Sequence, residues 1–193
     1  MMQEGQKTAE RKAEQRRLVL QRRNELSPGQ REKDSRTICE QILRSEIYRR
    51  SDTILVFKAF GSEADLSVFE QAAGSEGKTL LYPFCPDQEH LLPLKPGGAW
   101  ETDRFGIRVP VRTDAEEADP ASIDLILCPC AGFDESGGRL GMGKGYYDRF
   151  FPKCPQAFRL LVAFEAQRLE KVITEPWDVT MDGIVTEARL LLF

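Results

Sequence analysis

Asp124-Leu125-Ile126-Leu127-Cys128 decides the fold, because a short, continuous apolar run of this kind is typical of a strand buried on both faces. Similar runs occupy residues 53–57, 79–83 and 160–164, and a last one lies around 183–186. Helical patterns separate several of these runs. Continuous apolar strands that alternate with helices indicate a mostly parallel sheet. The sequence therefore predicts an α/β fold of three layers, with helices on both faces of the sheet.

The N-terminal part is expected to be a helical arm over about residues 8–50, packed on one domain that spans residues 1–193. A first helix is predicted over 8–26. Ser27 and Pro28 predict the start of a second, with Gln30 completing a capping box. A further helix is expected over 65–73, ending at Gly74, and the Pro- and Gly-rich segment 86–100 is expected to be loop.

Composition excludes several classes of protein. The chain has 193 residues, a length typical of one domain, and no apolar run long enough to cross a bilayer. Cys128 and Cys130 form no C-x-x-C pair and are interpreted as small buried residues, and His90 is the only histidine. We therefore expect no zinc site and no disulfide framework, and a reducing, cytoplasmic location.

The charge is uneven, because residues 1–50 hold 13 Lys and Arg against 8 Asp and Glu, whereas the whole chain has a net charge of −4. A basic arm can bind nucleic acid, but acidic residues are interleaved throughout this one, which is typical of a solvated helical face. We expect no nucleic-acid partner, no membrane partner and a monomer.

The segment 137–149 carries the chemistry. It reads GGRLGMGKGYYDR and is rich in glycine, so its backbone N–H groups can converge on an anion, while Arg139 and Lys144 supply full positive charges. Gly138 to Lys144 fits the first seven positions of a P-loop, but Gly145 stands where the Mg²⁺-binding hydroxyl belongs. Taken alone, the pattern suits a phosphate site and a mobile surface loop about equally.

The wider string, from Phe133-Asp134 through Gly138-Arg139-Leu140-Gly141 to Tyr146-Tyr147-Asp148-Arg149, resembles the signature of the 5-formyltetrahydrofolate cyclo-ligase family. The resemblance covers almost the whole chain. It implies a fold similar to the NagB/RpiA/CoA-transferase-like fold, ATP and Mg²⁺ as cofactors, and a reduced folate as the small-molecule substrate. It also implies a reaction in which ATP phosphorylates the formyl oxygen, so that N10 can close the ring and phosphate can leave.

Site residues follow from the matching positions. The resemblance implies catalytic roles for Arg139, Lys144 and Asp148. It implies ATP contacts by Lys12, Arg16, Arg139, Leu140, Gly141, Met142, Gly143, Lys144, Gly145, Tyr146 and Tyr147. It implies folate contacts by Lys58, Glu63, Met142, Gly143, Lys144, Gly145 and Tyr146, and Mg²⁺ ligation by Asp148 and Asp178.

Each of these assignments has a plain alternative. Lys12 and Arg16 can be two of many solvated basic residues, Glu63 can be a carboxylate at a helix start, and Tyr146 and Tyr147 can be core aromatics. Departures from the family pattern occur at Phe57, Ala59, Val109 and Cys130. They leave two other functions open, a related ATP-dependent enzyme acting on another formyl or amide substrate, and a non-catalytic nucleotide-binding module.

Overall fold

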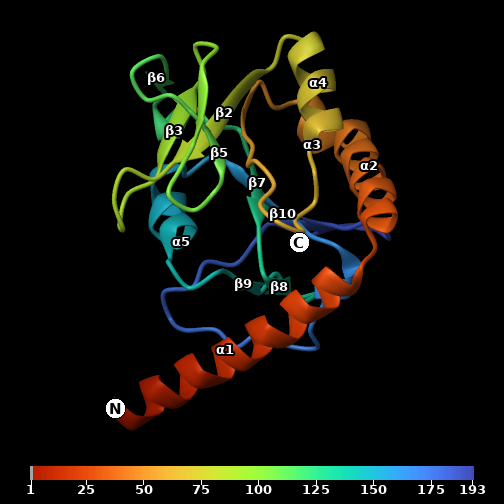
Figure 1. Ribbon diagram of the computed structural model, residues 1–193, viewed down its shortest axis with the longest axis vertical. Coiled ribbons are helices and arrows are strands. Elements are labelled where there is room, and N and C mark those ends of the chain that lie inside the picture. Colours follow the sequence, from red (N-terminus) through yellow and green to blue (C-terminus); the bar gives the residue numbers. More distant parts are fainter. Residues whose placement is uncertain (1) are drawn as a thin grey trace.

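The computed structural model describes residues 2–193, with side chains described from residue 5. Its centre is an eight-stranded sheet with the strand order β12-β11-β10-β7-β1-β2-β3-β6 (Figure 1). Strands β11, β10, β7, β1 and β2 run parallel, and the outer strands β12, β3 and β6 are antiparallel to their neighbours. The prediction of a mostly parallel α/β sheet is confirmed.

The strands of this sheet are β1 (Thr53–Leu55), β2 (Thr79–Phe84), β3 (Leu92–Lys95), β6 (Glu116–Glu117), β7 (Leu125–Pro129), β10 (Phe158–Val162), β11 (Gly183–Val185) and β12 (Leu190–Leu192). Two small hairpins lie outside it, β4 (Trp100–Thr102) with β5 (Arg108–Pro110), and β8 (Gly132–Phe133) with β9 (Arg139–Leu140). The helices are α1 (Met2–Glu25), α2 (Pro28–Arg44), α3 (Glu46–Arg49), α4 (Ser67–Ser75) and α5 (Tyr146–Phe150), and short 3₁₀ turns are η1 (Pro120–Ser122), η2 (Phe151–Lys153) and η3 (Glu165–Gln167).

The two faces of the sheet are covered unequally. Leu125 and Leu127 of β7 face a core formed with α2, α3 and α4, whereas Ile126 and Cys128 face α5, η2 and their loops. This alternation is the two-residue period of a strand, and both sets are fully buried, which explains why the run is apolar throughout. No helix of the described part of the chain is long and apolar enough to span a bilayer.

Helix α1 crosses the end of the sheet where the parallel strands finish (Figure 1). It contacts β8 and η3, which follow the carboxyl ends of β7 and β10. Ligands of parallel α/β sheets bind at this edge. The placement of α1 is therefore what brings its basic residues to the candidate site.

Some local predictions were wrong. The segment 86–100 is not all loop, because it contains β3, in which Leu94 pairs with Tyr82 of β2. Pro93 lies opposite Pro83 of β2, and its carbonyl accepts the N–H of Ala118. The predicted last strand is followed by β12, and only half of the capping box forms: Ser27 Oγ accepts the N–H of Gln30, whose side chain donates to Asp34.

Candidate functional site

The glycine-rich segment forms a hairpin and an exposed loop at the carboxyl end of β7. The β8–β9 hairpin leads into residues 141–145, which connect β9 to α5. Gly143 has φ +87° and Gly145 has φ +66°, in the left-handed region that L side chains rarely adopt. Met142, which precedes Gly143, is 54% exposed, and Lys144 between the two glycines is exposed as well. The loop backbone therefore faces solvent and is free to meet a ligand.

Asp134 holds the base of this loop. Its buried carboxylate accepts the N–H groups of Ser136, Gly138 and Val172 at 2.7–3.0 Å. Burial raises its pKa, but these donors outweigh burial and hold the pKa below its ordinary value. A Cβ at Gly138 would lie 2.5 Å from Asp134 Oδ2, so this glycine is required for close approach. Asp134 is part of the sequence motif, but the sequence analysis predicted no role for it.

One face of α1 contacts two parts of the site. Arg16 Nε donates to the Gly141 carbonyl at 2.8 Å, and a Cβ at Gly143 would lie 3.5 Å from the Arg16 guanidinium carbon. Lys12 Nζ lies 2.7 Å from Glu175 Oε2 and 2.5 Å from Asp178 Oδ2. Lys12 is only 7% exposed, so the alternative of a solvated basic face does not describe it. Burial lowers the pKa of Lys12, but the two carboxylates more than compensate and raise it.

Arg139 and Asp148 form a second pair beneath the loop. Arg139 Nη2 donates to Asp148 Oδ2 at 2.7 Å, and the guanidinium lies 5.7 Å from the ring centroids of both Tyr147 and Phe151. The Arg139 side chain is 5% exposed, and its buried Nε has no hydrogen-bond partner among the described residues. This donor lies beside a loop whose backbone is open to an anion.

The two carboxylates predicted to bind Mg²⁺ come together at this point. Val179, which follows Asp178, directs its N–H at Asp148 Oδ1 at 3.5 Å. Asp148 accepts from Arg139 through its Oδ2 atom, and Asp178 accepts from Lys12 through its Oδ2 atom. Oδ1 of Asp178 accepts no hydrogen bond from the described part of the chain. No cluster of three or more His, Cys, Asp or Glu suited to a metal occurs among the described residues. The pair fits Mg²⁺ as an ion that keeps most of its waters and takes one or two carboxylates.

Two of the predicted folate residues, Lys58 and Glu63, lie outside the glycine-rich loop and have charged partners within the protein. Lys58 is paired with Glu70, and its ammonium lies 5.1 Å and 5.0 Å from the ring centroids of Tyr82 and Trp100. Trp100, at the end of the segment expected to be loop, is thus part of this cluster.

Glu63 lies in the turn before α4. Its Oε2 accepts the Phe60 N–H at 3.0 Å, and its Oε1 lies 3.7 Å from Arg23 Nη1. The helix-start alternative for Glu63 is not what the structure shows, because α4 begins at Ser67 and Asp65 Oδ1 accepts the Ser67 N–H at 2.9 Å.

The remaining predicted residues differ in accessibility. Leu140 is buried against Val19 and Val172, so only its backbone can reach a ligand. Tyr147 packs against Phe151 with ring centroids 5.8 Å apart, as the core-aromatic alternative expected. Tyr146 and Lys144 line a cavity of about 200 Å³ together with Gln88, Arg104 and Phe105. Tyr146 is fixed there by donating to the Asp87 carbonyl at 2.7 Å.

Sequence comparison places the chain in a family. The model of the 5-formyltetrahydrofolate cyclo-ligase family matches residues 8–187. The chain belongs to this family. Membership in the cyclo-ligase family confirms the resemblance of the glycine-rich motif, and it confirms the prediction that the chain is an enzyme, a ligase.

Relatives named as cyclo-ligases match over most of their length. The 5-formyltetrahydrofolate cyclo-ligase of Escherichia coli (strain K12) is 27% identical over 180 residues, which cover 90% of this chain and 98% of the relative. The cyclo-ligase of Mus musculus is 26% identical over 185 residues, with 88% and 90% coverage.

The solved structures agree on the fold. The NMR structure of the Aquifex aeolicus 5,10-methenyltetrahydrofolate synthetase has a TM-score of 0.81 and 28% identity, and the match covers 94% of this chain and 92% of that one. The synthetase from Mycoplasma pneumoniae, at 22% identity and a TM-score of 0.77, supports the fold alone.

Two residues that contact the candidate site were not predicted from the sequence. Glu175 shares Lys12 with Asp178, and Arg23 faces Glu63. A signal for Arg23 was present, since residues 12, 16, 19 and 23 share one helical stripe, and Val19 at its centre is fully buried. The large number of arginines in α1 hid which one faces inward.

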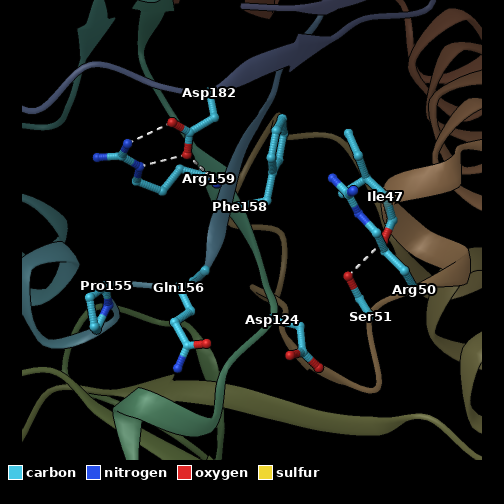
Figure 2. Close-up of a pocket in the computed structure, with 10 residues that line it drawn as sticks. Ile47, Arg50, Ser51, Asp124, Pro155, Gln156, Phe158, Arg159 and Asp182 are labelled. Atoms are coloured by element: carbon cyan, nitrogen blue, oxygen red, sulfur yellow. Dashed lines mark hydrogen bonds and ion pairs between the residues drawn. The ribbon is translucent and has the colours of Figure 1, made fainter.

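A larger cavity, about 420 Å³, opens at the opposite end of the strands (Figure 2). Its charged residues are mostly neutralised within the protein. Asp124 accepts the N–H groups of Asp52 and Thr53, and Arg159 forms a forked pair with Asp182. Because these groups brace the starts of the strands, this cavity does not compete with the loop as the candidate active site.

Proposed function

We propose that the chain converts 5-formyltetrahydrofolate to 5,10-methenyltetrahydrofolate, with ATP consumed and ADP and phosphate released. The formyl oxygen attacks the γ-phosphorus and ADP leaves. N10 then attacks the activated formyl carbon and loses its proton, and the C–O bond breaks to release phosphate. No covalent enzyme nucleophile is needed, so the protein's task is to position both substrates and neutralise charge.

The convergence of three chain segments on one loop carries this proposal. Arg16 of α1 bonds to the loop carbonyl of Gly141, Arg139 lies beneath the loop, and Lys12 lies on the same stripe of α1 as Arg16. Lys144 is exposed within the loop itself. Together they can surround a triphosphate with four cations and with the open backbone of residues 141–145.

We further propose that Asp148 and Asp178 hold Mg²⁺ with ATP. A bound Mg²⁺ would neutralise charge on the transferring phosphoryl group. Arg139 and Lys12 hold these two carboxylates through their Oδ2 atoms, and the N–H of Val179, next to Asp178, points at Asp148 Oδ1. On the folate side, Glu63 and Lys58 are proposed to bind the pterin and the acidic tail, with Tyr146 lining the entrance.

The test is a mixing experiment with the purified protein. We expect the absorbance of the conjugated methenyl product to rise when 5-formyltetrahydrofolate, ATP and MgCl₂ are all present, and not when ATP is omitted or a chelator is in excess. Product formation at an undiminished rate without nucleotide would refute the phosphorylation route. ATP binding without product from any formyl or amide compound tested would favour the non-catalytic alternative.

We propose a cytoplasmic monomer as the working form. All five cysteines carry free thiols, and those of Cys39, Cys128, Cys130 and Cys154 are buried, in agreement with a reducing compartment. Light scattering measures the mass directly, and a mass twice the 21.9 kDa of the chain would contradict the monomer.

A further inference from the structure

We propose that Arg23 is a positioning residue for the folate half of the site, holding Glu63 ionised and oriented toward the N–H groups of the substrate's pterin ring. The inference rests on the proposed function and extends it to a residue of α1 outside the ATP contacts. It is drawn from the contacts of Arg23 with the turn 60–63.

Arg23 is anchored on one side and unpaired on the other. Its Nε donates to Ser62 Oγ at 2.9 Å, and Ser62 donates in turn to Asn24 at 2.5 Å. Arg23 is 5% exposed, and its Nη1 is buried with no hydrogen-bond partner among the described residues. Its nearest carboxylate is Glu63 Oε1 at 3.7 Å. An unmade hydrogen bond on a buried charge is costly, so this donor is expected to have a use.

Glu63 is constrained in the complementary way. Its Oε2 is occupied by the Phe60 N–H, whereas Oε1 has only the longer contact with Arg23. Burial raises the pKa of Glu63, and the Phe60 N–H and the positive charge of Arg23 oppose that rise. A carboxylate must be ionised to accept two N–H groups from a pterin. Arg23 therefore supplies the charge that keeps the acceptor available while leaving one of its oxygens free.

The pair is largely removed from solvent, because the side chain of Arg23 is 7% exposed and that of Glu63 is 14% exposed. The titratable groups near the pair on the surrounding elements are Cys128 in β7, Cys130 just after it, Tyr147 on α5 and Arg31 on α2. Arg23 is thus the only group in that set with a positive charge directed at Glu63.

The experiment compares Arg23→Gln with Arg22→Gln, a matched control on the exposed side of the helix, where Arg22 donates to the Arg168 carbonyl. We expect Arg23→Gln to raise KM for 5-formyltetrahydrofolate about tenfold, the loss of roughly one charge-assisted hydrogen bond, with KM for ATP within about twofold of wild type. The acid limb of kcat/KM for folate should move to higher pH, because removal of the charge raises the pKa of Glu63. Arg22→Gln should change none of these values.

A double variant separates positioning from general support of α1. If Arg23 acts through Glu63, Arg23→Gln combined with Glu63→Gln should bind folate no more weakly than Glu63→Gln alone. Additive losses, or equal changes in both KM values, would overturn the inference. Ser62→Ala is a second test that leaves the charges of Arg23 and Glu63 in place. It removes the hydrogen bond that holds Arg23 Nε, and it should raise KM for folate but not KM for ATP. No change of the folate KM in either single variant also overturns the proposal.

Failure of the proposed function is seen separately, in the wild type. A wild-type protein that makes no methenyl product refutes the function whatever the Arg23 variants do. Normal wild-type turnover with an unchanged folate KM in Arg23→Gln refutes only the positioning role.

Discussion

Substitution of Gly143 by valine tests whether the exposed loop is an ATP site. Gly143 has φ +87°, so a β-branched residue there is strained by roughly 1–3 kcal/mol whatever space surrounds it. The added Cβ itself would make only ordinary contact, 3.5 Å from the Arg16 guanidinium. Strain of that size in a ligand-binding backbone corresponds to about a 5- to 150-fold loss of affinity. We therefore expect ATP affinity in calorimetry, and 1/KM for ATP in the absorbance assay, to fall by at least about fivefold.

Gly77 provides a control with the same strain at a remote place. It has φ +77° and lies in the exposed turn between α4 and β2, where an added Cβ would meet no atom within 4 Å. Gly77→Val should lower thermal stability to an extent comparable with Gly143→Val but leave KM for ATP unchanged. If Gly143→Val binds ATP normally, or if both variants lose ATP affinity equally, the loop is not the nucleotide site.

Three further variants examine the charges of the site. Asp148→Asn should abolish most turnover and also lower Tm, because it leaves the buried guanidinium of Arg139 without its counter-ion. Breaking a buried ion pair in this way costs about 3–5 kcal/mol. Asp182→Asn breaks an ion pair at the opposite edge of the sheet and should keep full turnover. Glu63→Gln should weaken folate binding strongly but measurably, and its Tm relative to the wild type should rise with pH. Because the pKa of Glu63 is raised in the folded protein, the wild type loses stability as pH rises from about 4.5 through that folded-state pKa. The Tm of the variant minus the Tm of the wild type should therefore increase from pH 4 to pH 7. A difference in Tm that stays constant with pH would contradict this. Arg16→Ala should raise KM for ATP, whereas Arg17→Ala, on the exposed side of α1, should not. Equal kinetics in the two variants would mean that Arg16 is only a solvated basic residue.

The sheet could be predicted because its central strands are buried on both faces. A run such as 124–128 must be apolar at every position, and that pattern is visible in one sequence. The edge strands could not be predicted in the same way. Strand β3 contains Pro93, and β12 is short and lies near the end of the chain, so local pattern and composition favoured loop.

The motif allowed the residues of the candidate site to be predicted, but not which residues they contact. Glycines in the motif permit the positive φ that the structure has at Gly143 and Gly145, although they do not specify which of them adopt it. The pairing of Lys12 with Asp178 joins residues 166 positions apart, and only the path of α1 across the sheet brings them together. The same holds for Arg23 and Glu63, since helical periodicity identifies a stripe but not what lies opposite it.

The resting ion pairs explain how one site can hold four cations and several carboxylates before any ligand binds. Lys12 and Arg139, the cations proposed to meet phosphate, are neutralised by Asp178 and Asp148, the carboxylates proposed to meet the metal. Each pair is largely removed from water, so separating it without compensation costs several kcal/mol. A nucleotide alone would draw the two cations away from Asp148, Asp178 and Glu175. A divalent ion alone would leave Arg139 unpaired and Lys12 with Glu175 as its remaining partner. The two ligands together supply opposite charges to both sets of groups. These ion pairs therefore favour binding of the metal–nucleotide complex over binding of the metal ion or the nucleotide alone. The contacts responsible already exist in the protein before any ligand binds.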